Sequence, residues 1–150
     1  MDALSLLKKD HKTVKALFKS IDSAPEGSPR QKSLFDELRL ELEVHDAIES
    51  KIFYPELKAH PKAKAIVAEA HEEHHVIKLL LAEMQKLAVK DEAWQAKFQV
   101  LMENVLHHAE EEESEMFPQA RQAFEKAELD ELGRKMKILK DEETARRKRR

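Results

Sequence analysis

The sequence contains an internal repeat, and no other feature constrains the fold as strongly. Residues of the same kind recur at an offset of 63 positions, and in each copy 34 residues separate the first recurring histidine from the second. The matched pairs are His11 with His74, Val14 with Ile77, Phe18 with Leu81, Ile21 with Met84, Phe35 with Phe98, Leu38 with Leu101, His45 with His108, Glu49 with Glu112, Phe53 with Met116 and Pro55 with Pro118. The apolar matches alone indicate a duplicated core. The matched histidines and glutamate indicate more than packing.

The composition favours helix along almost the whole chain. More than half of the 150 residues are Ala, Glu, Lys, Leu or Arg, and only two are Gly. Apolar residues recur at helical spacing in the long segments, and none of these segments is rich in β-branched or aromatic residues. The sequence therefore predicts an all-α fold class.

Turn and capping signals predict where the helices begin and end. The pair Ser28–Pro29 suits the N-cap and first turn of a second helix. Pro55 is expected to kink or end that helix, and His60–Pro61 marks the next boundary. Asp91 is expected to cap a fourth helix.

Four helices of roughly 20–28 residues with short joints predict an up-down-up-down four-helix bundle. A short additional C-terminal helix is expected to begin near Asp130 and to fade into the basic tail Arg146–Arg150. We therefore expect the bundle over residues 1–126 and a helical segment with the basic tail over residues 127–150. Such a tail is typical of a solvated, frayed end. The alternative is contact with an anionic partner or a membrane surface.

Charge and cysteine content exclude several classes of protein. The net charge of −3 is too small to indicate a nucleic-acid partner, and the absence of Cys excludes disulfides, thiolate metal sites and a cysteine nucleophile. The N-terminus lacks the pattern of a signal peptide, and no apolar run reaches the roughly 18–20 residues of a membrane span. A cytoplasmic location is expected. No feature points to a particular protein partner or oligomeric state.

The repeated histidines and glutamates lie on helix faces that are expected to be buried. His11 is followed by apolar residues at +3, +7 and +10, and His74 shows the same spacing. In the second helix of each copy a histidine precedes a glutamate by four residues, which places both side chains on one face, a turn apart. These pairs are His45 with Glu49 and His108 with Glu112.

Four buried histidines and two buried carboxylates would cost several kcal/mol unless they are paired or bind a cation. Imidazole suits Fe, Zn, Cu and Ni, and a carboxylate can bridge two ions. A single His–Glu pair would be a surface pair, and a lone histidine on an apolar stripe a core residue. Recurrence on four helices favours a two-metal site instead. The predicted ligands are His11, His45, Glu49, His74, His108 and Glu112.

Neighbouring residues compete for these roles. His71 and His75 flank His74, His107 precedes His108, and glutamates fill positions 110–113. The repeat selects His74 and His108, together with Glu112. His71 and His75 are themselves four residues apart, so they are either a separate surface metal pair or solvated residues on the flank of the helix.

The sequence resembles the hemerythrin-like family, also called the HHE cation-binding domain, over residues 10 to 120. The resemblance is carried by Asp10-His11-x-x-Val14, by His45-x-x-x-Glu49 followed by Phe-Tyr-Pro55, by Glu73-His74-x-x-Ile77, and by His108-x-x-x-Glu112 followed by Met-Phe-Pro118. It implies an antiparallel bundle around two iron ions (Fe2+/Fe3+) bridged by an oxo or hydroxo group, with other divalent metals as alternatives. It also implies that His11 and His45 hold one iron, that His74 and His108 hold the other, and that both glutamates bridge.

One position departs from the oxygen-carrying members of the resembled family, which have a further histidine one turn before the third-helix ligand. Ala70 stands there. The resemblance therefore implies a more open centre, with room for water, for a small ligand such as O2, NO or peroxide, or for a nearby side chain such as His71. Ferritin-like bundles use Glu-x-x-His spacing and more carboxylates, so they rank well behind.

Three functions stay open at this stage. The first is a metal-binding protein that binds or senses O2, NO or peroxide, or holds iron. The second is a di-iron enzyme that reduces peroxide or NO, although the sequence shows no dedicated proton relay and Tyr54 is its only tyrosine. The third is a metal-free helical module that binds another protein. Whether the protein is an enzyme is thus not decided by the sequence.

Overall fold

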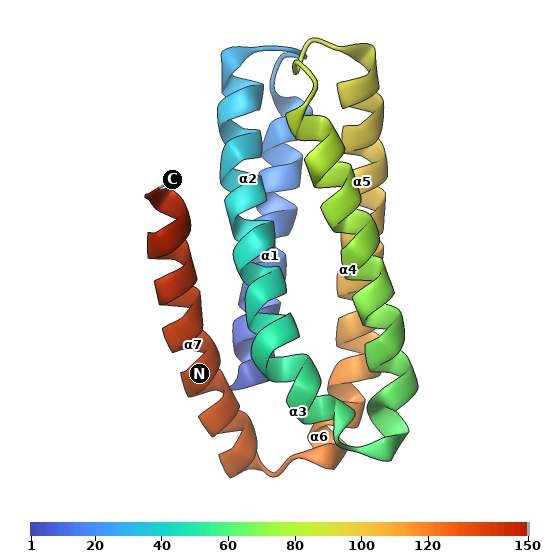
Figure 1. The fold of residues 1–150 in the computed structure, drawn as a ribbon, viewed down its shortest axis with the longest axis vertical. Coiled ribbons are helices and arrows are strands. Elements are labelled where there is room, and N and C mark those ends of the chain that lie inside the picture. The colour runs from blue at the N-terminus through green and yellow to red at the C-terminus, as the bar shows by residue number, and fades with distance from the viewer. Residues whose placement is uncertain (150) are drawn as a thin grey trace.

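The computed structural model describes residues 1–149, and all regular structure in that range is helical. The predicted all-α fold class is confirmed. Five helices are long, and short helical segments connect or extend them (Figure 1). The long helices are α1 (Ala3–Ser23), α2 (Pro29–Ile48), α4 (Lys64–Gln85), α5 (Glu92–Glu111) and α7 (Lys126–Lys148).

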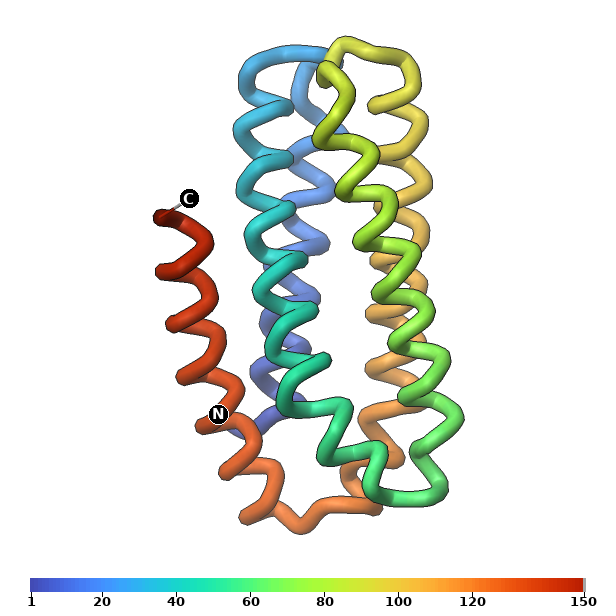
Figure 2. Tube along the Cα trace, in the orientation of Figure 1, coloured from blue at the N-terminus to red at the C-terminus, as the bar shows by residue number. Residues whose placement is uncertain are grey.

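The helices α1, α2, α4 and α5 run side by side and alternate in direction along the chain (Figure 2). Their main contacts join α1 with α2 and α4 with α5, which are the two copies of the repeat. The helix α7 lies against α1 and α2. The first copy of the repeat is therefore covered by a helix that the second copy lacks.

Two of the predicted helix starts are confirmed by their side-chain caps. The Ser28 hydroxyl accepts a hydrogen bond from the Gln31 amide, and Pro29 is the first residue of α2. The Asp91 carboxylate accepts from the Ala93 amide at the start of α5. These local signals were sufficient because the donors and acceptors lie within one helical turn.

The C-terminal helix is longer than predicted. It begins at Lys126 rather than near Asp130, because the Glu125 and Glu128 side chains form a capping box. It continues to Lys148, so this part of the basic tail is helical, with Arg146 and Lys148 exposed to solvent, whereas Arg150 lies outside the described residues. The expected fraying stays a prediction. Its Gly133 packs so closely on the backbone of Met1 and Asp2 that no Cβ would fit. The expected division of the chain near residue 126 stays a prediction.

The buried apolar residues form two clusters, one toward each end of the long helices. One cluster contains Leu7 and Phe53 with residues from α7, and the other contains Phe18, Trp94 and Phe98. Buried polar residues lie between the two clusters. On α1, for example, the buried His11 lies between Leu7 of one cluster and Val14 of the other. The apolar clusters thus fix the helices on both sides of a polar layer.

The two second helices of the repeat widen at matched positions. After α2 comes a π-helical turn, η1 (Glu49–Phe53), and after α5 comes η3 (Glu112–Met116). Each turn is followed by a short α-helix with proline near its start, α3 (Tyr54–Lys58) and α6 (Phe117–Ala123). Proline lacks an N–H and its ring clashes with the carbonyl four residues earlier, so the wider turn relieves the clash. Regular α2 thus ends at Ile48, before Pro55, and the chain stays helical through the π turn into α3, which contains Pro55. The irregularity expected from Pro55 is a π-helical turn that precedes it.

The joint between α3 and α4 contains a 3-10 turn, η2 (Pro61–Ala63), which confirms the boundary predicted at His60–Pro61. Within residues 1–149, no helix combines the length and the apolar character that crossing a membrane requires.

Candidate metal centre

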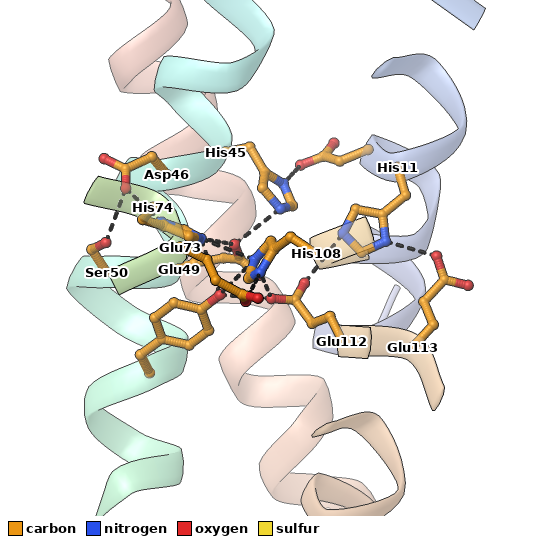
Figure 3. A network of polar contacts seen from close by, with 12 residues as sticks. His11, His45, Asp46, Glu49, Ser50, Glu73, His74, His108, Glu112 and Glu113 are labelled. Atoms are coloured by element: carbon orange, nitrogen blue, oxygen red, sulfur yellow. Dashed lines mark hydrogen bonds and ion pairs between the residues drawn. The ribbon is translucent and has the colours of Figure 1, made fainter. Parts of the chain in front are cut away.

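The structure brings all six predicted ligands together in the buried polar layer (Figure 3). The four histidines come one each from α1, α2, α4 and α5. The two glutamates are the first residues of the π-helical turns η1 and η3. Every one of the six side chains is buried, and Glu49 is 0% exposed. The six side chains lie together in the structure. Whether they bind metal stays a prediction.

Each glutamate lies between two histidines of different copies of the repeat. Glu49 Oε1 is 3.1 Å from His45 Nε2 and 3.1 Å from His74 Nε2. Glu112 is 3.2 Å from His11 Nε2 through Oε1 and 3.2 Å from His108 Nε2 through Oε2. The carboxylates thus connect the two halves, which is the position that a bridging ligand requires.

The outward nitrogen of every one of these histidines contacts a further carboxylate. Because an ionised carboxylate only accepts hydrogen bonds, Nδ1 carries a proton, and in the neutral form of each imidazole the lone pair of Nε2 would point inward. Carboxylates in this position orient metal-binding histidines and raise their basicity. The contacts are His45 with Asp10 (2.9 Å), His74 with Asp46 (2.6 Å), His108 with Glu73 (2.6 Å) and His11 with Glu113 (2.7 Å).

Several inward atoms have no hydrogen-bond partner. They include the Nε2 atoms of His11 and His45, both oxygens of Glu49 and one oxygen of Glu112. Buried polar atoms are almost always satisfied in folded proteins, since leaving them unpaired costs about 1–3 kcal/mol each. The unpaired atoms of the centre are imidazole nitrogens and carboxylate oxygens, and they belong to residues whose ligand atoms lie within 4.8 Å of one another in two groups, so this donor set fits metal ions.

The electrostatics also indicate a place for a cation. Burial alone would lower the pKa of His45, but the charge of Glu49 and the bond to Asp10 raise it well above its usual value. His108 behaves alike: burial opposes the shift, yet bonds to Glu112 and Glu73 raise its pKa to about 10. The raised pKa values of His45 and His108 favour their charged forms in the metal-free protein, and a metal ion would compete with those protons.

The donor atoms form two groups, one in each half. Glu49, His74, His108 and Glu112 place ligand atoms within 4.8 Å of one another, and so do His11, His45 and Glu112. The Nε2 atoms of His74 and His108 are 3.1 Å apart. Two nitrogens bonded at right angles to one ion at about 2.1 Å would lie about 3 Å apart.

Tyr54 was not predicted as part of this centre, yet its hydroxyl lies inside it. The Tyr54 Oη donates to Glu112 Oε2 at 2.6 Å and lies 3.1 Å from His74 Nε2. Burial, followed by the charges of Glu112 and Glu49, raises its pKa well above the usual value. The sequence contained one signal, since Tyr54 directly precedes the repeated proline. Its counterpart in the second copy is Phe117, which stacks on His11 instead.

The competing histidines lie outside the centre. His71 and His75 are exposed on α4, and the ring of His71 packs edge-on against Tyr54 with centroids 5.3 Å apart. Because the Tyr54 hydroxyl already occupies the space beside His74, the structure offers it rather than His71 as the extra donor. His107 is exposed as well, and its ring is 2.9 Å from Glu111.

A cavity of about 290 Å³ adjoins the centre. Apolar side chains form one part of its wall, and all four histidines of the centre and four charged residues form the rest. A space of this size and character suits a small uncharged molecule. The apolar walls are Val14, Leu42, Ile77, Leu81, Val105, Leu106 and Ala109, and the polar part is His11, His45, His74, His108, Glu43, Asp46, Lys78 and Arg147.

Comparison with known proteins identifies the family. The sequence profile described as Hemerythrin HHE cation binding domain matches residues 2–120. The chain belongs to this family. The matched range contains both π-helical turns and all six histidine and glutamate residues of the centre. The resemblance inferred from the His-x-x-x-Glu motifs is therefore confirmed.

Relatives of this HHE domain protein support the assignment. Uncharacterized protein Rv2633c of Mycobacterium tuberculosis (strain H37Rv) is 32% identical over 137 residues, which are 91% of this chain and 83% of the relative. Uncharacterized protein Mb2666c of Mycobacterium bovis shows the same identity and coverage. The crystal structure of a Hemerythrin HHE cation binding domain-containing protein from Mycobacterium kansasii, described as an Rv2633c homolog, superposes with a TM-score of 0.87 and 32% identity. That match covers 97% of this chain and 88% of the other, so it includes α7.

Proposed function

We propose that this HHE domain protein holds two iron ions in a four-helix bundle and uses them to bind or sense a small molecule such as O2, NO or peroxide. Other divalent metals are alternatives to iron. The proposed ligands are His11 and His45 for one ion, His74 and His108 for the other, and Glu49 and Glu112 for both. The cytoplasmic location expected from the sequence stays a prediction.

One observation carries this proposal. Four Nε2 atoms and two carboxylates meet in one buried layer as two adjoining groups, while the opposite nitrogen of every histidine contacts a carboxylate. A core built only for packing would not leave the nitrogens of His11 and His45 and the oxygens of Glu49 buried without partners. Iron would supply open coordination positions and one-electron redox changes at this point.

The protein side chains have distinct tasks in this proposal. The outer carboxylates fix the orientation of the imidazoles, and the apolar cavity beside them admits an uncharged ligand while limiting the water around it. The Tyr54 hydroxyl can donate a hydrogen bond to a ligand or to Glu112. It also stands where a further oxygen ligand would stand beside His74 and His108.

Metal analysis is the first test. Protein purified gently and without oxygen is expected to contain close to two metal ions per chain, and a His11→Ala, His74→Ala double variant is expected to lose them. The exposed His75→Ala, His107→Ala double variant is the matched control and keeps its metal. Near-zero iron, manganese and zinc in the wild type, with unchanged stability on adding iron, would favour the metal-free interaction module.

Gas binding needs a separate test. Stopped-flow absorption of the reduced, iron-loaded protein is expected to change on mixing with O2 or NO. An absence of change with both gases would rule out gas binding while leaving metal binding in place.

A second candidate function is peroxide or NO reduction, and the position of Tyr54 favours it. The sequence alone offered no proton donor near the metals, but the structure places the O–H of Tyr54 2.6 Å from Glu112. Turnover with peroxide is expected to fall in Tyr54→Phe and to vanish in His74→Ala. Turnover that survives His74→Ala would mean that the centre is not responsible.

A further inference from the structure

The two halves of the centre differ in the charges behind their histidines, and the largest difference comes from α7. Asp10 is 3% exposed and uses both oxygens: Oδ2 lies 2.9 Å from His45 Nδ1, and Oδ1 accepts from Lys140 Nζ at 2.5 Å. Lys140 belongs to α7 and its side chain is only 24% exposed. A partly desolvated positive charge thus lies one carboxylate away from a predicted metal ligand.

In the second half, the residue beside the outer carboxylate is acidic, where the first half has Lys140. The repeat mate of Asp10 is Glu73, which lies 2.6 Å from His108 Nδ1. Glu73 has no Lys or Arg ion pair among the described residues, and besides His108 the titratable side chains beside it are those of Glu111 and His107. The second half has one lysine, Lys78, on the outer carboxylate of His74, but its side chain is 61% exposed and therefore screened by water.

The donor sets are unequal in the same direction. The His74–His108 half brings four ligand residues together, and the Tyr54 hydroxyl lies 3.1 and 3.3 Å from its two nitrogens. The His11–His45 half brings together three ligand residues, and its ring neighbour is the apolar Phe117. More donors and less positive charge both favour a divalent cation in the His74–His108 half.

We propose that the two halves bind metal in a fixed order, the His74–His108 half first and the His11–His45 half second, and that Lys140 of α7 widens the difference in affinity. This inference rests on the proposed two-metal centre. Lys140 acts through Asp10 as a positioning residue: its charge offsets part of the negative charge by which Asp10 raises the basicity of His45, and the same positive charge repels an incoming cation. The helix that only the first copy possesses thereby sets the affinity of that copy's metal.

The test is anaerobic titration of the metal-free protein with Co2+, followed by visible absorption and calorimetry. The wild type is expected to bind two ions in two resolved steps, and His11→Ala to abolish only the weaker one. Lys140→Gln keeps a hydrogen-bond donor but removes the charge, so the weaker step is expected to tighten about three- to tenfold. This is less than the roughly 10–100-fold change that follows loss of an outer carboxylate. Lys140→Arg keeps the charge and restores the wild-type curve.

Two matched controls separate charge from docking of α7. Lys78→Gln removes an exposed lysine from the other half, and Lys51→Gln removes the ion pair of 3.0 Å between η1 and Glu143 of α7. Both are expected to change the weaker step less than about twofold. Lys140→Gln is informative even where His11→Ala fails to fold, because it alters a residue with partial access to water.

Each outcome addresses a different part of the proposal. Fewer than two Co2+ ions per wild-type chain would overturn the two-metal centre and the loading order with it. Two ions of equal affinity, or loss of the stronger step in His11→Ala, would overturn the order alone. A Lys140→Gln curve that matches the wild type or the Lys51→Gln control would overturn the role of Lys140.

Discussion

The two copies of the repeat agree in their inner residues and differ in what surrounds them. Each contributes two histidines and one glutamate at matched positions, and in each the glutamate begins a π-helical turn. The surroundings diverge at Tyr54 against Phe117, at Asp10 against Glu73, and in α7, which contacts α1 and α2. Duplication therefore accounts for the donor set, while later substitutions around it make the two halves chemically unequal.

The two halves should not respond independently to changes at Glu49 or Glu112, because each of these glutamates contacts a histidine of both halves. Glu49→Gln and Glu112→Gln are each expected to weaken binding of the second metal ion by more than about 100-fold, beyond the effect of losing an outer carboxylate. The measurement is metal content after gel filtration. Glu110→Gln, at an exposed position in the same acidic run, is the control. Two retained ions in either glutamine variant would contradict the bridging role.

The outer carboxylates sharpen the comparison. Asp10→Asn and Glu73→Gln are each expected to weaken metal binding in their own half by about 10–100-fold, and Glu73→Gln more strongly because no lysine neutralises Glu73. Metal-free stability should respond in the reverse order. Asp10→Asn should destabilise the metal-free protein more, because it leaves the charge of Lys140 unpaired beside a residue that is only 3% exposed. Glu73→Gln should destabilise it less, because Glu73 is 25% exposed. Metal titration and chemical denaturation measure the two effects, and equal effects of both variants would refute the asymmetry.

Tyr54→Phe and Phe117→Tyr each make the two matched positions identical, so either substitution should reduce the difference between the halves. Tyr54→Phe removes the donor to Glu112 and is expected to cost about 1–3 kcal/mol of unfolding free energy in the metal-free protein. Phe117→Tyr inserts an oxygen next to a fully buried ring, and overpacking should cost about 1–3 kcal/mol. Denaturant unfolding measures both. A neutral Tyr54→Phe would show that the Tyr54–Glu112 bond contributes nothing to the metal-free fold.

The smallest expected effect concerns the attachment of α7. Bonds from Lys51 and Arg146 lower the pKa of Glu143 to about 2. A depressed folded-state pKa gives stability that is present above the usual carboxyl value of 4.5 and is lost as pH falls through about 2. Glu143→Gln should thus lower stability by about 1 kcal/mol at pH 7, given its exposed partners, and by little near pH 2. Thermal unfolding at several pH values measures this, and a pH-independent difference would contradict it.

The sequence predicted the helices and the six inner residues because both depend on local or repeated signals. Ser28 and Asp91 cap their helices through side chains that reach only two or three residues along the chain. The centre could be predicted because duplication placed each histidine and glutamate in two equivalent contexts. Repeated residues carry information about tertiary structure that single residues do not.

The outer carboxylates show where sequence reasoning ends. Asp10 and Glu73 could have been found, because they are repeat mates that each precede a predicted histidine. Asp46 and Glu113 could not, because their repeat mates are Ala109 and Ser50. His11 lies on α1 and Glu113 in η3, 102 residues apart, so only tertiary packing brings them together. The length of α7 was missed because a Glu–Glu capping box is a weak signal.

The π-helical turns change the phase of the helix as well as its width. In a regular α-helix, successive residues turn by about 100°, so a residue five positions after another points about 140° away from it. Tyr54 is five positions after Glu49, yet both side chains reach the centre, and the Tyr54 amide donates to the Glu49 carbonyl as a π turn requires. A search of sequences for ligands at helical spacing would skip this tyrosine. For domains of this kind, the residue five places after each glutamate of a His-x-x-x-Glu motif should be read as adjoining the histidine and glutamate cluster. The identity of that residue is one means by which one half can be distinguished from the other.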